Sequence, residues 1–127
     1  MKLLFVMIGG SLGALSRYSL SILAAKYIES RFPWGTLIAN LSGCFIIGIT
    51  FGLIDRIGLL GPSARLFFMT GFLGALTTFS TYALETVNSW RTGSNQIAIV
   101  NFLVNNFIGV ALVLAGIFLI QTIFKGE

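Results

Sequence analysis

Four long apolar segments, separated by short polar turns, constrain this chain more than any other feature of its sequence. They cover about residues 3–25, 36–54, 64–89 and 97–124. A helix rises about 1.5 Å per residue, so segments of this length match the roughly 30 Å hydrocarbon layer of a bilayer. The pattern predicts an all-α integral membrane protein with four transmembrane helices in a single domain over residues 1–127. Glycines interrupt the first segment and further apolar segments follow it, so we interpret it as a transmembrane helix rather than a signal peptide.

The composition excludes most soluble classes of protein. Of the 127 residues, 56% are hydrophobic and 9% are charged, whereas a soluble domain has about 25% charged residues. The lysines and arginines are dispersed, which argues against nucleic acid as a partner. The sequence has no histidine and one cysteine, Cys44. It therefore offers no zinc cluster, no internal disulfide and no nucleophile beside a base, and we do not expect an enzyme.

The third segment contains small and hydroxylic residues where a lipid-facing helix would be apolar. The run is GFLGALTTFSTYALE, residues 71–85, and its unusual members are Gly74, Thr77, Thr78, Ser80 and Thr81. Inside a bilayer, backbone that leaves the helix must be buried in protein or line a cavity, and such breaks coordinate ions in transport proteins. The run predicts a broken third helix, with the break near residues 74–78, and an ion site at mid-membrane.

Asparagines in the second and fourth segments are the next polar signal. Asn40 lies about five residues into the second segment, and Asn101 and Asn105 lie four residues apart, so they share a helix face. Interhelical hydrogen bonds, commonly worth about 1 kcal/mol or less, are the simplest role for such amides. Because Asn106 adds a third amide to the fourth segment, we favour a path for water or an ion.

Helical spacing after the break groups further polar side chains on one face. The hydroxyls of Thr77, Ser80 and Thr81 share this face, and Glu85 follows Thr81 by four residues. We therefore expect the carboxylate of Glu85 to reach these hydroxyls. Glu85 is the only acidic residue within a predicted span, and an ionisable residue in a membrane is a functional candidate by default.

Two aromatic residues and one arginine complete the set of candidates. Phe79 and Tyr82 lie three residues apart. Ring edges carry positive potential and can contact an anion, although packing is the commoner reason for such a pair. Arg17, near the end of the first segment, either snorkels to the interface or lines an anion vestibule. With hydroxyls and amides as donors, this lining suits a small anion better than a cation.

The charges at the two ends of the spans do not set an orientation. One side carries Lys2, Arg56, Arg65 and Lys125, and the other carries Lys26, Arg31 and Arg91. The positive-inside rule needs a marked excess of Lys and Arg on one side. This balance is compatible with insertion in both orientations and an antiparallel dimer, and equally with a fixed topology set by the insertion machinery.

Three blocks, in this order, carry a family resemblance: GGSLGALSRY, WGTLIANLSG and TGFLGALTTFSTYALET. They resemble the bacterial Fluc (CrcB) fluoride channels, and the resemblance covers the whole chain. It implies a fluoride-selective ion channel in the cell membrane, the bacterial inner or plasma membrane, that passively exports fluoride. It also implies a dual-topology antiparallel homodimer with two pores, and a structural Na⁺ at the dimer interface.

The resemblance also implies roles for individual residues. Backbone carbonyls of Gly74 and Thr77 from both subunits would hold the sodium ion. The pore would include Phe79 as the first of two pore phenylalanines, Asn40 as the pore amide, Arg17 as the vestibule base, and Ser80, Thr81 and Glu85 as pore-side polar groups. Asn101 and Asn105 would fall on the polar face of the fourth helix. Tyr82 stands where the second phenylalanine is usual.

Two alternatives stay open from the sequence. The chain is compatible with a partner subunit of a heterodimeric fluoride channel with a degenerate pore, because of the tyrosine at position 82. Small multidrug exporters also have four short spans and mixed topology. Their proton-coupled export of cationic drugs needs a deep acid in the first span, where this chain has none.

Overall fold

The computed structural model describes residues 1–125, which form helices joined by short turns and contain no strand. The first two helices are α1 (Lys2–Tyr27) and α2 (Trp34–Ile57). The third span consists of α3 (Pro62–Arg65), η1 (Leu66–Leu73), α4 (Gly74–Leu76) and α5 (Phe79–Arg91). The fourth consists of α6 (Asn95–Leu103), η2 (Val104–Ile108) and α7 (Gly109–Ile123). The elements η1 and η2 are wider turns of π-helix within otherwise continuous helices.

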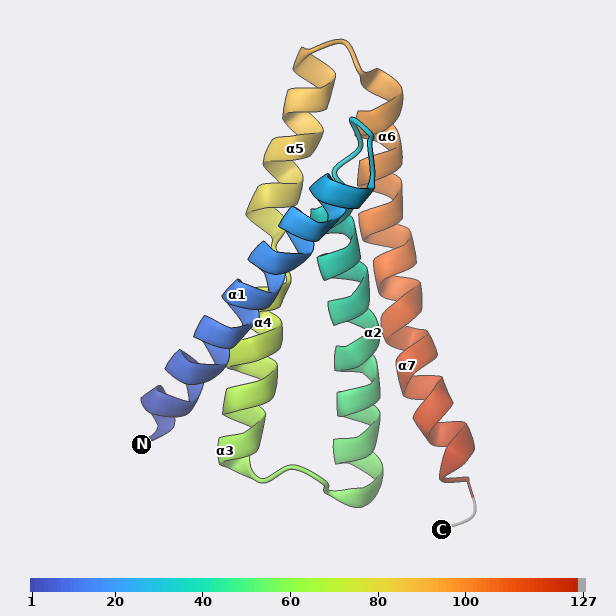
Figure 1. Ribbon diagram of the computed structural model, residues 1–127. Helices are drawn as coiled ribbons and strands as arrows, with labels where there is room; N and C mark the ends of the chain where they lie inside the picture. Colours follow the sequence, from blue (N-terminus) through green and yellow to red (C-terminus); the bar gives the residue numbers. More distant parts are fainter. Residues whose placement is uncertain (126–127) are drawn as a thin grey trace.

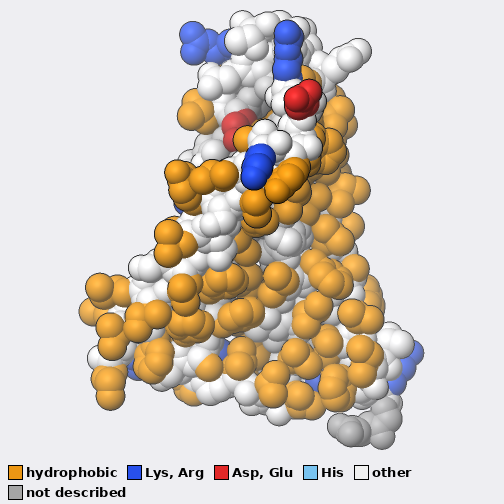
Figure 2. All heavy atoms as spheres, viewed as in Figure 1, with side chains coloured by type: hydrophobic (Ala, Val, Ile, Leu, Met, Phe, Trp, Pro, Cys, Tyr) orange, Lys and Arg blue, Asp and Glu red, His pale blue; other side chains and the backbone are white. Residues whose placement is uncertain are grey.

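Four helical segments are long and apolar enough to cross a membrane: Lys2–Tyr27, Trp34–Ile57, Pro62–Arg91 and Asn95–Ile123. They confirm the predicted all-α class and the four transmembrane helices. Figure 1 shows the N-terminus, the end of α7 and the α2–α3 turn toward one end of the molecule, and the α1–α2 and α5–α6 turns at the other. Hydrophobic side chains cover most of the visible middle of the molecule, while basic residues lie at both ends (Figure 2).

Small residues let the helices approach closely. A Cβ on Gly13 of α1 would be about 3.1 Å from the Cβ of Ala75 and would also overlap the carbonyl of Phe72 in η1. A Cβ on Gly116 of α7 would lie 2.6 Å from the carbonyl oxygen of Phe45 in α2. These contacts agree with the role of small residues in membrane helix packing. The glycines therefore fix how α1 lies on the third span and how α7 lies on α2.

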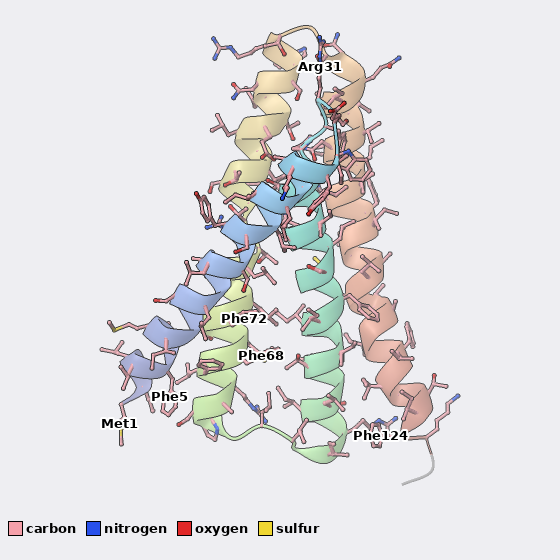
Figure 3. The ribbon with its side chains drawn as sticks, viewed as in Figure 1. Met1, Phe5, Arg31, Phe68, Phe72 and Phe124 are labelled. Atoms are coloured by element: carbon pink, nitrogen blue, oxygen red, sulfur yellow. The ribbon has the colours of Figure 1, made fainter. Side chains whose placement is uncertain are left out.

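The buried core lies between α2 and the first half of the third span. Ala39, Leu73 and Leu76 are buried there. The rings of Phe68 and Phe72 stack beside them with centroids 5.7 Å apart. Figure 3 shows both rings projecting from the third span between the helices. This apolar packing holds α4 against α2 immediately before the third helix breaks.

The third helix breaks at Thr77 and Thr78, inside the predicted range. Both residues have extended backbone angles, with φ −84° and ψ 151° at Thr77 and φ −148° and ψ 121° at Thr78. Gly74 keeps helical angles, so the break is narrower than the predicted range of 74–78. Thr78 is the N-cap of α5, because its hydroxyl accepts a hydrogen bond from the backbone N–H of Thr81 at 3.3 Å.

Candidate functional site

A cavity of about 340 Å³ opens beside this break, and we call it the break cavity. Its walls come from α2, η1, the break itself, α5 and η2. The polar residues and the two aromatic rings in the lining are Asn40, Cys44, Thr77, Thr78, Phe79, Tyr82, Asn105 and Asn106. The structure thus brings together residues that are far apart in the sequence, from three of the four spans.

Asn40 of α2 holds the break in place. Its side-chain oxygen accepts a hydrogen bond from the N–H of Thr78 at 2.8 Å. Its amide nitrogen donates to the carbonyl oxygen of Thr78 at 3.2 Å and to Oδ1 of Asn105 at 2.9 Å. An amide has two hydrogens and one carbonyl oxygen, so every polar group of Asn40 is engaged. Its role as a pore amide stays a prediction.

The hydrogen bonds continue through the fourth span, in a series that we call the amide chain. Asn105 donates to both oxygens of Asn101, each at 2.9 Å. Asn101 is completely buried, and it donates to the hydroxyl of Thr86 at 2.9 Å. Thr86 donates to the carbonyl oxygen of Tyr82 at 2.8 Å. The amide chain, Asn40–Asn105–Asn101–Thr86, therefore ties α2, the fourth span and α5 together by interhelical hydrogen bonds.

The same contacts remove the helical partners of two backbone carbonyls. In a continuous α-helix, the N–H of Thr78 would bind the carbonyl of Gly74, and the N–H of Thr81 would bind that of Thr77. Here the N–H of Thr78 binds Asn40, and the N–H of Thr81 binds the Thr78 hydroxyl. The break thus frees the carbonyl oxygens of Gly74 and Thr77, the pair predicted to hold a cation.

Phe79 and Tyr82 lie together at the cavity but differ in exposure. Their ring centroids are 5.4 Å apart and the rings meet at 65°, an edge contact. Phe79 is 76% exposed, while Tyr82 is only 5% exposed. The hydroxyl oxygen of Tyr82 accepts a hydrogen bond from the amide of Asn106 at 2.7 Å. The second aromatic residue is therefore anchored to the fourth span, whereas the first projects outward.

Glu85 lies at a different cavity, of about 210 Å³, between the α1–α2 turn and α5. Its Oε1 accepts a hydrogen bond from the hydroxyl of Thr36 at 2.7 Å, and its Oε2 is buried without a partner among the described residues. The expectation that this carboxylate reaches the hydroxyls near Thr81 is wrong. Helical spacing allowed that contact, but α2 lies close enough to supply a nearer donor.

The hydroxyls divide differently from the sequence prediction. Thr77 donates back to the carbonyl of Leu73 at 3.0 Å, so it belongs to the helix before the break. Thr78, and not Thr77, groups with the other two hydroxyls: the Thr78 hydroxyl lies 3.1 Å from that of Thr81 and 3.5 Å from that of Ser80. The predicted grouping of Thr77 with the other two hydroxyls is therefore wrong. The error arises because the extended backbone at Thr77 and Thr78 interrupts the helical spacing on which the grouping was based.

The remaining candidate, Arg17, lies apart from these groups. It occupies α1, is half-buried, and does not line the break cavity. Its role as a vestibule base stays a prediction.

Sequence reasoning missed Thr36 and Thr86, and it gave no individual role to Thr78. A sequence signal existed for Thr78, because threonine is a preferred N-cap and a helix restarts directly after it. No such signal marked Thr36, whose importance comes from its contact with a residue 49 positions away.

Comparison with known proteins places the chain in a family. Residues 4–117 match the model of the family described as CrcB-like protein, Camphor Resistance (CrcB). A protein of Salinibacter ruber, named fluoride-specific ion channel FluC, is 47% identical over 116 residues, which cover 91% of this chain and 86% of the relative. Proteins with the same name from Acidobacterium capsulatum and Desulforapulum autotrophicum are 42% and 39% identical. The alignments cover 80% and 93% of this chain, and 82% and 94% of those relatives. The chain belongs to the CrcB-like protein family.

Proposed function

We propose that this chain forms a fluoride-selective ion channel of the cell membrane, through which fluoride leaves the cell passively. The single observation that carries the proposal is the break cavity, a space that amide and hydroxyl side chains and two aromatic rings line beside a broken helix, within the third of four membrane-spanning segments. Relatives that match most of the chain are named fluoride-specific ion channels. The proposed activity is transport, so the protein is not an enzyme.

The physical task of such a pore is to replace the water around a small anion without binding the ion too tightly. The exposed ring of Phe79 and the edge contact with Tyr82 present the positive rim of aromatic rings near the cavity. The hydroxyls of Ser80 and Thr81 follow on the same helix. Flow is driven by the membrane potential, which is worth about 2.3 kcal/mol per elementary charge for each 100 mV.

The working unit of the proposal is an antiparallel dimer with two pores. Phe79 is 76% exposed beside the cavity, and a Cβ on Gly10 of α1 would meet no other atom within 4 Å. A second copy in the opposite orientation would cover such surfaces. The balance of basic residues on the two sides of the membrane is compatible with insertion in both orientations, which the proposal requires.

A structural sodium ion between the two copies completes the proposal. Carbonyl oxygens are ligands that hard cations accept, and those of Gly74 and Thr77 have lost their helical donors. Gly74 is exposed at the surface, where a second copy can bring its own pair of carbonyls. Bound Na⁺ would offset the partial negative charge at the C-terminal end of the helix before the break.

The test is ion efflux from liposomes that contain only this purified chain. We expect rapid fluoride efflux with negligible chloride loss, and a loss of dimer or of efflux when sodium is replaced by N-methylglucamine. Fast efflux that is independent of sodium would rule out a required cation. If a folded, monodisperse sample shows no fluoride efflux, the chain does not form a channel by itself. That result would favour a subunit that needs a different partner, which is the alternative that Tyr82 keeps open.

A further inference from the structure

The amide and hydroxyl hydrogens of the side chains that line the break cavity can be counted donor by donor. Both amide hydrogens of Asn40 and both of Asn105 bind acceptors within the protein. Asn106 uses its two hydrogens on the Tyr82 hydroxyl and on the carbonyl of Phe102, at 2.7 and 2.8 Å. The hydroxyls of Thr77 and Thr78 also donate within the protein. These side chains have no hydrogen left for an ion.

The hydroxyl of Tyr82 is different. Its oxygen accepts from Asn106, and its hydrogen has no acceptor among residues 1–125. The amide of Asn106 cannot be reversed without cost, because the carbonyl of Phe102 requires a donor at the same nitrogen. The orientation of Asn106 therefore makes the tyrosine an acceptor on that side, and leaves the phenolic hydrogen for another partner.

Burial makes that free hydrogen significant. Tyr82 is 5% exposed and lines the break cavity, within a membrane-spanning segment. A buried hydroxyl without an acceptor is costly, more so away from bulk water. Whatever occupies the cavity must accept this hydrogen bond, which water and anions can do and metal cations cannot.

We propose that the hydroxyl of Tyr82 donates a hydrogen bond to fluoride in the break cavity, and that Asn106 is the positioning residue that leaves its hydrogen free. The inference rests on the proposed function and adds to it a residue that determines selectivity. It also opposes a simple alternative, in which the extra oxygen of tyrosine only narrows the path. The two hypotheses predict opposite effects when that oxygen is removed.

The test compares Tyr82→Phe with the wild-type chain in the liposome efflux assay. We expect fluoride efflux to fall about tenfold, the scale of one lost hydrogen bond to an ion, and the ratio of fluoride to chloride efflux to fall with it. Tyr18→Phe, on the exposed face of α1, is the matched control and should behave as wild type. Unchanged or faster fluoride efflux from Tyr82→Phe would overturn the proposal. A silent wild-type chain would instead overturn the proposed function.

A double-mutant cycle tests the role of Asn106. Asn106→Ala should slow fluoride efflux in the wild-type background and have little further effect in the Tyr82→Phe background, because it acts through the hydroxyl. Equal effects in both backgrounds would show that Asn106 acts independently of the tyrosine and would remove its positioning role.

A binding measurement by NMR tests the contact between fluoride and the Tyr82 hydroxyl without measuring ion efflux. The sequence has three tyrosines, so NMR of protein labelled with ¹³C at the tyrosine Cζ should give three assignable signals. We expect sodium fluoride, but not sodium chloride, to shift the Tyr82 signal and to leave those of Tyr18 and Tyr27 in place. Equal responses to both salts, or no response in a sample that conducts fluoride, would contradict donation to the anion.

Discussion

Asn40 and Asn105 of the amide chain line the same cavity as the aromatic residues Phe79 and Tyr82, but the two pairs differ in what they leave free for a ligand. Asn40 and Asn105 donate all their amide hydrogens to acceptors within the protein. Phe79 instead projects outward with 76% of its surface exposed, and Tyr82 keeps a free hydroxyl hydrogen. The difference teaches that polarity within a membrane span does not by itself mark an ion contact. Satisfied amides hold the break, and unsatisfied groups are available to an ion.

The amide chain also shows why the break persists. Two extended residues in the middle of a membrane leave backbone groups without helical partners. Asn40 donates to the carbonyl of Thr78 and accepts from its N–H. In a continuous helix, these two backbone groups would bind other backbone groups of the same helix. The break is therefore a product of α2 as much as of the third span.

The strongest test of this comparison is Asn40→Ala. It removes three hydrogen bonds and leaves the N–H and carbonyl of Thr78 without side-chain partners. We expect a loss of about 2–4 kcal/mol in the free energy of unfolding, measured by detergent-induced unfolding, together with loss of efflux. Asn88→Ala, at an exposed position of α5, is the control and should change stability by less than about 0.5 kcal/mol. A variant as stable as wild type would show that Asn40 does not hold the break.

Phe79→Ile tests the aromatic residues instead of the amides. Because the ring is exposed on the single subunit, we expect the free energy of unfolding of the subunit to stay within about 0.5 kcal/mol of wild type. Fluoride efflux should fall by up to about tenfold, since the variant loses the aromatic edge. Phe118→Ile, at a position of α7 that is 61% exposed, is the matched control and should conduct normally. If both variants conduct equally well, Phe79 does not contact the ion.

Thr86→Val tests the far end of the amide chain with a smaller change. Valine keeps the shape of threonine but removes the acceptor for Asn101 and the donor to the carbonyl of Tyr82. We expect a loss of about 1 kcal/mol in stability, the usual scale for hydrogen bonds between membrane helices, with efflux close to wild type. Thr122→Val is the control, because Thr122 bonds only within its own helix. A large loss of efflux with normal stability would place Thr86 on the ion path instead.

The sequence predicted the four membrane-spanning helices well, because length and hydropathy act locally and the bilayer sets the required span. It also placed the break, since a cluster of small and hydroxylic residues within an apolar span is unfavourable where a helix faces only lipid. Asn101 and Asn105 were expected to share a face, and they bond to each other. Each of these inferences used residues close together in the chain.

Contacts between helices were not predictable in the same way. Glu85 could be paired with Thr81 from spacing alone, but its donor is Thr36 of α2. Which helix lies opposite a residue depends on crossing angles, and close approaches set those angles, such as that of Gly13 to the carbonyl of Phe72. The wide turn η2, which carries Asn105 and Asn106, has no recognisable sequence signal. The free hydrogen of Tyr82 could not be predicted either, because it depends on the contact with Asn106 of the fourth span.

The proposed path of fluoride runs through the break cavity, and the only cysteine of the sequence, Cys44, lies in the wall of this cavity. The direct measurement is fluoride efflux before and after the thiol is converted to a bulky disulfide adduct in detergent, with complete reaction verified by mass. We predict that the adduct blocks efflux and that Cys44→Ser conducts and is insensitive to the reagent. Unchanged efflux from fully modified, folded protein would contradict the claim, because the ion would then pass elsewhere.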